Sequence, residues 1–236
     1  MSLDDLARRA EKLAVDGRAI LGITGSPGAG KSALAGLLIE LLDPEGAWVA
    51  RVPMDGFHLA DAALDRLGRR SRKGAIDTFD AYGYLAMLRR IQTERDHTVY
   101  APDFQRTLEQ PIAGAIAIAP ATRLVITEGN YILSAEEPWP EVRRELREVW
   151  YVELDELVRR ARLVARHVDF GKSEAAARRW VDEVDEANAR AIVARRGLAD
   201  LWIYMSTPEA EVPPPTLRNL AVTATSTAPS SVKATQ

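Results

Sequence analysis

The sequence contains no cysteine, which excludes a disulfide framework and every metal site built on thiolates. It has only three histidines in 236 residues, and they are scattered, so a zinc centre is not expected either. No apolar run approaches the roughly 20 residues that a helix needs to cross a bilayer. These absences argue against disulfide-stapled, zinc-dependent and membrane-spanning proteins.

An excess of charge is also absent, because the formal net charge is only −3. A dedicated binder of nucleic acid polymers or anionic membranes would be expected to be basic. Near the N-terminus, Asp4 and Asp5 stand where a signal peptide would have its apolar stretch. We therefore expect a cytoplasmic protein, a monomer or homodimer, whose partner is a small molecule.

The clearest motif is a complete G-x-x-x-x-G-K-[ST] phosphate-binding loop, Gly25-Ser26-Pro27-Gly28-Ala29-Gly30-Lys31-Ser32. A short apolar run at 19–24 precedes it, and leucines at helical spacing follow it, which is the strand–loop–helix order that the motif requires. An ordinary glycine-rich turn is the alternative. The motif predicts that backbone N–H groups of Gly25, Ser26, Gly28, Ala29 and Gly30 cradle the phosphates of ATP. It also predicts that Lys31 reaches the β- and γ-phosphates and that Ser32 holds Mg²⁺.

Strands and helices alternate along the chain, which predicts an α/β fold: a doubly wound parallel sheet with helices on both faces. The expected strands are 19–24, 47–52, 123–127, 149–154 and 201–205. The stretch 99–120 receives no assignment. Residues 1–206 form one expected domain, and 207–236, rich in Pro, Ser, Thr and Ala, is predicted to be a disordered tail.

Two helices are expected before the last strand. The first, 155–168, is predicted to bury its apolar positions Leu157, Ala161, Val164 and Val168. The second begins at the capping residue Ser173 and is predicted to bury Trp180, Val184, Ala187 and Ala191.

Two carboxylates follow predicted strands. Asp55 lies just past the second strand, where it could accept a proton from an attacking hydroxyl, although Asp-Gly is also a common turn. Glu128 follows 124–127 and could hold Mg²⁺, or it could simply begin a loop. Ligands of open α/β sheets bind at this edge, so both residues are candidates for the site.

Three arginines, at positions 159, 162 and 166, have spacings of three and four and share one helix face. Such a face could close over phosphates as a lid and stabilise transition-state charge. The alternative is a solvated charged face, which is common on surface helices.

Several further segments occur in a fixed order: 52–59 (Val-Pro-Met-Asp-Gly-Phe-His-Leu), 72–74 (Arg-Lys-Gly), 77–80 (Asp-Thr-Phe-Asp), 99–102 (Val-Tyr-Ala-Pro) and 128–131 (Glu-Gly-Asn-Tyr). Over residues 17–205 the chain resembles the P-loop kinases that include uridine kinase, bacterial pantothenate kinase and phosphoribulokinase. It is most similar to the nucleoside/nucleotide kinase-like branch, which includes fructose-transport-associated kinases.

The resemblance implies a P-loop kinase fold with a helical lid. It implies that Asp55 is the catalytic base, that Glu128 lies on the Mg²⁺ side, and that Arg162 and Arg166 belong to the lid. It makes Arg72, Lys73, Tyr100 and Asn188 candidates for the acceptor pocket. Asn188 also falls beside an apolar helix face, where it would need a partner, or it is a surface residue.

The chain departs from its relatives where they recognise the acceptor. Pro102 stands where pantothenate kinases carry a histidine, and Gln105 where uridine kinases carry one. The predicted function is an ATP-dependent kinase that phosphorylates a hydroxyl of a nucleoside, pantothenate-like compound or sugar. Two alternatives remain. One is a kinase acting on a phosphorylated nucleotide or sugar, which Arg69, Arg70, Arg72 and Lys73 would suit, and the other is a non-catalytic nucleotide-binding switch.

Overall fold

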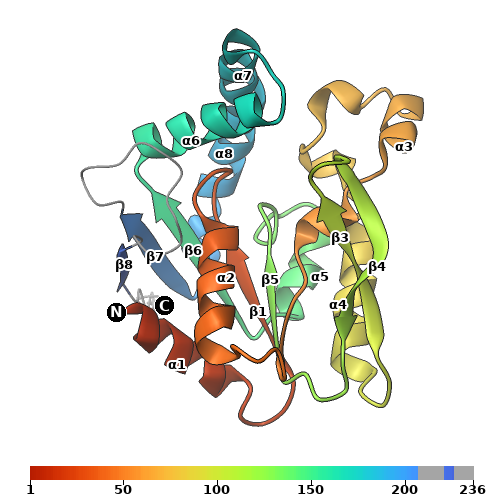
Figure 1. Cartoon of the computed structure of the whole chain (residues 1–236), viewed down its shortest axis with the longest axis vertical. Coiled ribbons are helices and arrows are strands. Elements are labelled where there is room, and N and C mark those ends of the chain that lie inside the picture. Colours follow the sequence, from red (N-terminus) through yellow and green to blue (C-terminus); the bar gives the residue numbers. More distant parts are fainter. Residues whose placement is uncertain (207–220, 226–236) are drawn as a thin grey trace, which may run out of the picture.

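The computed structural model describes residues 1–206 and 221–225, and its centre is a six-stranded sheet (Figure 1). The strand order is β2-β5-β1-β6-β7-β8. The parallel strands are β1 (Ala19–Thr24), β2 (Val49–Arg51), β5 (Leu124–Glu128), β6 (Glu148–Leu154) and β7 (Leu201–Ser206). All five predicted strands are confirmed, and the chain crosses over between non-sequential neighbours, as a doubly wound sheet requires.

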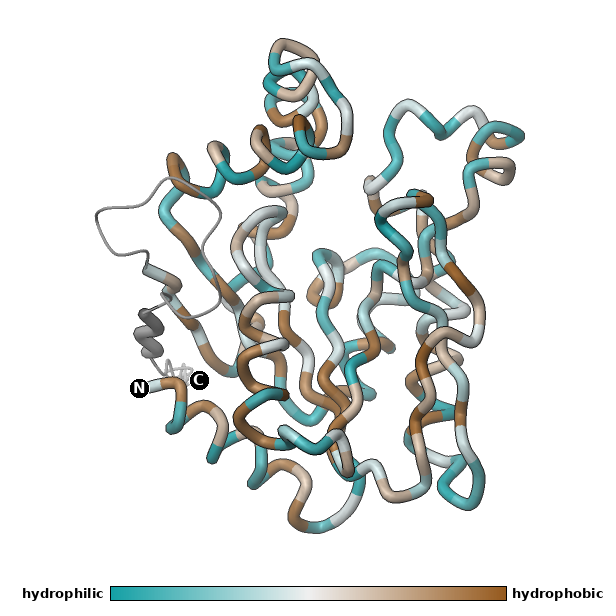
Figure 2. Tube along the Cα trace, in the orientation of Figure 1, coloured by the Kyte–Doolittle hydropathy of each residue, from teal (hydrophilic) through white to brown (hydrophobic). Residues whose placement is uncertain are grey.

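Helices cover both faces of the sheet, and each face has its own core (Figures 1 and 2). On one face lie α1 (Leu3–Leu13) and α2 (Lys31–Leu42), and on the other α4 (Ala81–Thr93) and α5 (Trp139–Arg144). Side chains of β1 alternate between the two cores, because successive residues of a strand point to opposite faces. The central strand is therefore apolar up to Thr24, and all of its residues are buried.

The stretch without a sequence assignment forms a separate antiparallel hairpin of β3 (Val99–Gln105) and β4 (Gln110–Ile118). Its register shifts by a bulge after Ala101, and Pro102 and Pro111 lie within the strands. Prolines and bulges break the regular alternation by which a strand is recognised in a sequence. The tip of this hairpin, residues 105–110, reaches the edge of the sheet where the phosphate loop lies (Figure 1).

A helical unit stands above the carboxyl edge of the sheet and corresponds to the predicted lid (Figure 1). It comprises α6 (Glu156–Asp169), α7 (Glu174–Trp180), the π-helix η4 (Val181–Asp185) and α8 (Glu186–Val193). The remaining helices are short: η1 (Met54–Phe57), α3 (Asp61–Arg66), η2 (Arg70–Arg72), η3 (Ile76–Thr78) and η5 (Arg196–Leu198). Among the described residues, no helix combines the length and the apolar character needed to span a membrane.

The predicted buried faces of the lid helices are wrong. In α6 the buried residues are Arg159 and Leu163, whereas Leu157 is 79% exposed. The helix turns its arginine face inward because the space beneath it is lined by polar groups of the phosphate loop. In the second predicted helix, Trp180 and Val184 are half-buried, but Ala187 and Ala191 are exposed. The π-helix after α7 adds a residue to the turn and rotates the face that follows, so α8 buries Ala189 and Ile192 instead.

The prediction of a disordered tail is wrong for one segment. Residues Ala221–Thr225 form strand β8, which pairs antiparallel with β7 between Trp202 and Ser206. The segment is rich in β-branched residues and satisfies the free backbone edge of β7. The rest of the predicted tail, 207–220 and 226–236, lies outside the described residues.

A buried arginine joins the sheet to the hairpin side of the molecule. The guanidinium of Arg18, just before β1, donates hydrogen bonds of 2.8–3.2 Å to five backbone carbonyls, those of Ile91, Glu94, Ala119, Pro120 and Thr122. These carbonyls belong to the end of α4 and to the connection between β4 and β5. A planar fork of donors can satisfy them together, and an ammonium cannot.

We expect Arg18→Ala to lower the free energy of unfolding by about 2 to 4 kcal/mol, because buried carbonyls lose their partner. Urea denaturation monitored by circular dichroism measures this. Arg8→Ala is the control, since Arg8 is exposed and pairs only with Asp5 in the described chain, and it should cost less than about 1 kcal/mol. Equal stability of the two variants would contradict the role assigned to Arg18.

Candidate active site

The phosphate loop joins β1 to the N-terminus of α2, as predicted. Gly25 has φ 151°, and a Cβ there would lie 2.3 Å from the carbonyl oxygen of Val152, so only glycine allows this approach to β6. Gly30 caps α2 in the left-handed region with φ 100°. These two positions curl the backbone so that the loop N–H groups and the start of α2 can face one anion.

Lys31 is buried, and its Nζ donates to the carbonyl oxygens of Gly25 and Ser26 at 2.9 and 3.0 Å. Burial lowers the pKa of the Lys31 ammonium to about 8, and the nearby carboxylates of Glu128 and Asp55 oppose that shift. The lysine therefore lies folded against its own loop with a destabilised charge. Phosphate oxygens would replace the carbonyls as stronger acceptors.

Glu128 ends β5 beside the loop and is 4% exposed. Its Oε1 accepts from the Ser32 Oγ at 3.0 Å and forms an ion pair of 2.6 Å with Arg51 Nη2 at the end of β2. A hydroxyl and a carboxylate in contact are hard oxygen ligands, which suit Mg²⁺ when phosphate oxygens and water complete its shell. Among the described residues, no group of three or more His, Cys, Asp or Glu side chains is placed to hold a metal ion by itself.

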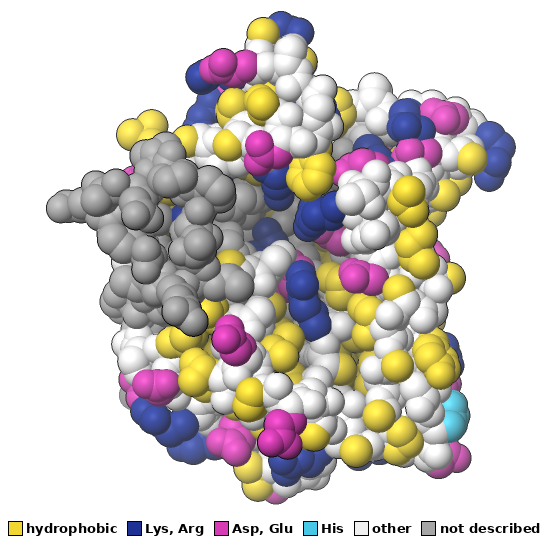
Figure 3. Space-filling view, viewed as in Figure 1, with side chains coloured by type: hydrophobic (Ala, Val, Ile, Leu, Met, Phe, Trp, Pro, Cys, Tyr) yellow, Lys and Arg dark blue, Asp and Glu magenta, His cyan; other side chains and the backbone are white. Residues whose placement is uncertain are grey.

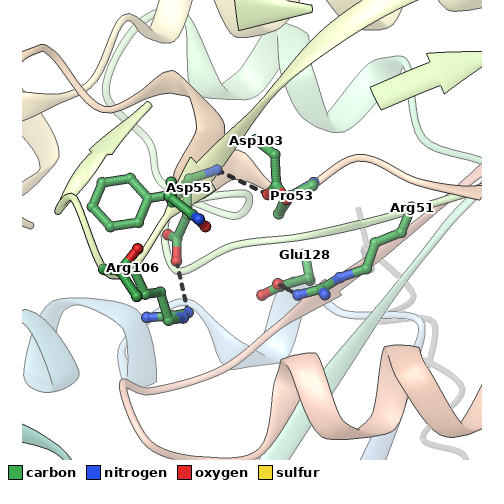
Figure 4. A pocket seen from close by; sticks show the side chains of 9 residues that line it. Arg51, Pro53, Asp55, Asp103, Arg106 and Glu128 are labelled. Atoms are coloured by element: carbon green, nitrogen blue, oxygen red, sulfur yellow. Dashed lines mark hydrogen bonds and ion pairs between the residues drawn. The ribbon is translucent and has the colours of Figure 1, made fainter. Parts of the chain in front are cut away.

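Asp55 lies in η1, which is separated from the end of β2 by two residues, and its side chain is 31% exposed. A Cβ at the next residue, Gly56, would lie 2.4 Å from the carbonyl oxygen of Pro102, so this glycine lets η1 pack closely under the hairpin. That packing brings Arg106, in the hairpin turn, to 3.6 Å from Asp55 Oδ2 (Figure 4). The sequence therefore correctly placed the aspartate at the strand end, but it did not indicate Arg106.

A cavity of about 300 Å³ opens between the end of β2 and the hairpin. Its lining includes Asp55, Glu128, Arg51, Arg106 and Phe104. In Figure 4 the carboxylates of Asp55 and Glu128 face this space. The cavity thus joins the predicted base to the predicted metal carboxylate, and it has room for a small molecule.

The three lid arginines do not share one environment. Arg159 is buried and donates to Pro27 O at 3.3 Å and to Glu186 Oε1 at 2.5 Å, so it ties α6 to the phosphate loop and to α8. Arg162 has a buried Nη2 without a hydrogen-bond partner in the described structure. Burial lowers the pKa of Arg166, while Asp185 and Asp55 oppose the shift.

Lys and Arg side chains accordingly gather in the hollow between the lid and the hairpin (Figure 3). Arg159 and Arg166 both depress the pKa of Lys31 through like-charge repulsion. A cluster of cations around a phosphate loop is destabilised until an anion enters it. The hollow is therefore built for a strongly anionic ligand.

The four residues predicted for the acceptor pocket do not lie together in one site. Arg72 pairs with Asp77 at 2.6 Å, and Lys73 pairs with Asp61 at 2.7 Å. Tyr100 is 58% exposed on β3, and Asn188 is half-buried on α8. None of these four lines the cavity beside Asp55.

Sequence reasoning missed Arg51, Phe104 and Arg106 because the hairpin had no assignment and because Arg51 was counted as part of a strand. Two further polar side chains, of Tyr131 and Asp185, were also not among the predicted residues. Tyr131 donates its hydroxyl to Gly74 O at 2.6 Å, and Asp185 is buried in the π-helix and pairs with His167 at 2.8 Å. A buried carboxylate that breaks an apolar helix pattern was a usable signal for Asp185.

No protein-family model matches the chain. The protein named "Putative uridine kinase C227.14" from Schizosaccharomyces pombe is 34% identical over 177 residues, which cover 72% of this chain and 75% of that protein. The "ATP-dependent kinase-like protein notR'" of Aspergillus versicolor is 37% identical over 152 residues, covering 61% and 88%.

A solved structure of a "putative fructose transport system kinase" from Silicibacter sp. TM1040 is 35% identical, has a TM-score of 0.73, and covers 83% of this chain and 96% of its own. The chain therefore belongs to the P-loop kinase family that includes these uridine kinase-like proteins.

Proposed function

We propose that this protein is an ATP-dependent kinase that transfers the γ-phosphoryl group to a hydroxyl of a small metabolite. The observation that carries the proposal is the cavity that joins Asp55 to Glu128 beside a complete phosphate loop. The names of the S. pombe and A. versicolor relatives describe kinases and agree with it. We expect the enzyme to act in the cytoplasm, where ATP and Mg²⁺ are available.

The phosphate loop binds the triphosphate in this proposal. Its N–H groups and the start of α2 surround the β-phosphate, and Lys31 leaves its carbonyl partners to contact the β- and γ-phosphates. Ser32 and Glu128 would hold Mg²⁺, which would neutralise phosphate charge during transfer. A non-catalytic switch would need the loop but no second cavity with a carboxylate base.

Asp55 acts as the general base on the acceptor hydroxyl. The hydroxyl oxygen forms a bond to the γ-phosphorus while its proton passes to the Asp55 carboxylate. The bond between the γ-phosphorus and the β–γ bridging oxygen breaks, and ADP leaves with that electron pair. For this to happen, Asp55 must exchange its contact with Arg106 for one with the acceptor.

The lid supplies Arg162 and Arg166 to the transferring group. Neither guanidinium has a carboxylate partner within hydrogen-bond distance in the described chain, and both are partly desolvated. Closure over the phosphates would give them anionic partners and exclude water, which otherwise hydrolyses ATP. Arg72, Lys73, Tyr100 and Asn188 remain candidates for contacts that form with a bound acceptor.

The proposal is tested by acceptor-dependent ADP release in a coupled assay over nucleosides, pantothenate, sugars and polyols. Asp55→Asn should reduce turnover by about 10²- to 10⁴-fold, the usual contribution of a positioned base. Nucleotide affinity should survive, because Lys31 and the loop are intact. Asp96→Asn, an exposed carboxylate far from the cavity, should behave like the wild type.

Glu128→Gln should instead weaken the apparent affinity for Mg²⁺, so that added metal partly restores the rate. Near-normal turnover of Asp55→Asn would contradict its assignment as the base. Rescue of Asp55→Asn by Mg²⁺ would make it a metal ligand. Nucleotide turnover that no acceptor stimulates would favour the switch over the kinase.

The burial of Lys31 predicts proton uptake on nucleotide binding. Because the pKa of Lys31 in the free enzyme is about 8, most molecules carry a neutral Lys31 above that pH. Phosphate anions raise this pKa again, so the lysine takes up a proton when nucleotide binds. At about pH 8.5 the binding of Mg·ADP should take up a sizeable fraction of a proton, and at about pH 6.5 almost none. Affinity should therefore fall as the pH rises through 8.

Isothermal titration calorimetry in buffers of different ionisation enthalpy measures that uptake. Lys31→Ala should bind nucleotide weakly at both pH values and should lose the pH-dependent uptake. The same proton balance for the wild type at both pH values would show that Lys31 remains charged in the free enzyme.

A further inference from the structure

Both carboxylates that have a chemical task in the proposed reaction are held by an arginine in the described structure. Glu128 pairs with Arg51 at 2.6 Å, and Asp55 pairs with Arg106 at 3.6 Å (Figure 4). The two arginines come from separate elements, the end of β2 and the turn of the β3–β4 hairpin. They line the same cavity.

Neither arginine has a second carboxylate partner within the described residues. The Arg51 Nε is buried and has no hydrogen-bond partner there. The side chain of Arg51 is 38% exposed and that of Arg106 is 46% exposed, so both have room to move within the cavity. The two guanidiniums thus depend on carboxylates that the reaction needs for other purposes.

The next step rests on the proposed function. When Asp55 binds a hydroxyl and Glu128 faces Mg²⁺, Arg106 and Arg51 lose their partners together. Two partly desolvated cations in one cavity are unfavourable unless an anion enters with the substrate. The phosphates of the nucleotide already have Lys31 and the loop N–H groups on the other side of Glu128.

We propose that the acceptor carries an anionic group, a carboxylate or a phosphate ester, in addition to its hydroxyl, and that Arg51 and Arg106 bind this group. A guanidinium presents paired donors that match the oxygens of either anion. The basic loop at 69–73 is a weaker candidate, because Arg69 and Arg72 pair with Asp77 and Lys73 pairs with Asp61. Binding of the anion would also release Asp55 from Arg106, so that the base becomes free when the correct acceptor arrives.

The first test titrates inorganic phosphate into full-length protein saturated with Mg²⁺ and a non-hydrolysable ATP analogue, so that the nucleotide's own phosphate sites are filled. Calorimetry should detect binding to the wild type. Arg51→Gln and Arg106→Gln should each weaken it by about 10- to 100-fold, the usual loss for a charged hydrogen bond. Arg178→Gln is the matched control, since Arg178 is exposed on α7 and pairs only with Glu174 in the described chain.

The second test measures ADP release with pairs of acceptors that differ only in the anionic group: glycerol and glycerate, pantothenol and pantothenate, ribose and ribose 5-phosphate. The anionic member should have a kcat/KM at least about 10-fold higher, and the carboxylate and phosphate pairs show which anion is preferred. Arg51→Gln and Arg106→Gln should remove this preference mainly through KM.

Equal or better use of the neutral members by the wild type would overturn the inference and leave the proposed kinase intact. So would unchanged phosphate binding in both variants, or loss of the preference in Arg72→Gln alone, which would place the anion at the basic loop. Weaker binding of Mg·ADP by Arg51→Gln would assign Arg51 to the nucleotide, and the inference that Arg51 binds the anionic group of the acceptor would be wrong. Absence of acceptor-dependent ADP release over the full screen would instead contradict the proposed function.

Discussion

The parallel pairing of β1 with β5 is the constraint on which the site depends. Their register sets Ile23 opposite Glu128, and the Gly129 N–H donates to Ile23 O at 3.0 Å. Because parallel strands end at the same edge of a sheet, the pairing of these two strands alone brings Glu128 beside the phosphate loop. The Ser32–Glu128 hydrogen bond follows from that register, and β2 on the far side of β5 brings Asp55 to the same edge.

Electrostatics then determine what the assembled edge can bind. Burial lowers the pKa values of Lys31, Arg162 and Arg166 around the phosphate loop, and Arg162 Nη2 has no hydrogen-bond partner in the described structure. Lys31 is held by carbonyls of its own loop, and Arg159 by Pro27 O and Glu186. Polar groups held in this way stay folded in place without ligand and exchange partners when an anion arrives. The same arrangement recurs in the cavity beside Asp55, where Arg51 pairs with Glu128 and Arg106 pairs with Asp55.

The lid shows why helical periodicity was misleading here. The pattern of α6 predicted an apolar face toward the core, but Arg159 and Leu163 are buried and Leu157 faces outward. A periodicity identifies two faces of a helix, yet which face turns inward depends on what lies beneath it. Under α6 lies the phosphate loop, so the polar face is the one that finds partners, and Arg159 donates to Pro27 O.

Local patterns were enough for the five strands, the phosphate loop, and the places of Asp55 and Glu128 at strand ends, because each depends on neighbours in the sequence. The tertiary structure alone decided which distant groups reach them. Arg106 meets Asp55 because a bulged hairpin packs over Gly56, and Arg51 meets Glu128 because β2 and β5 are parallel neighbours. Such contacts arise from strand order and close backbone packing, which no periodicity within one segment encodes.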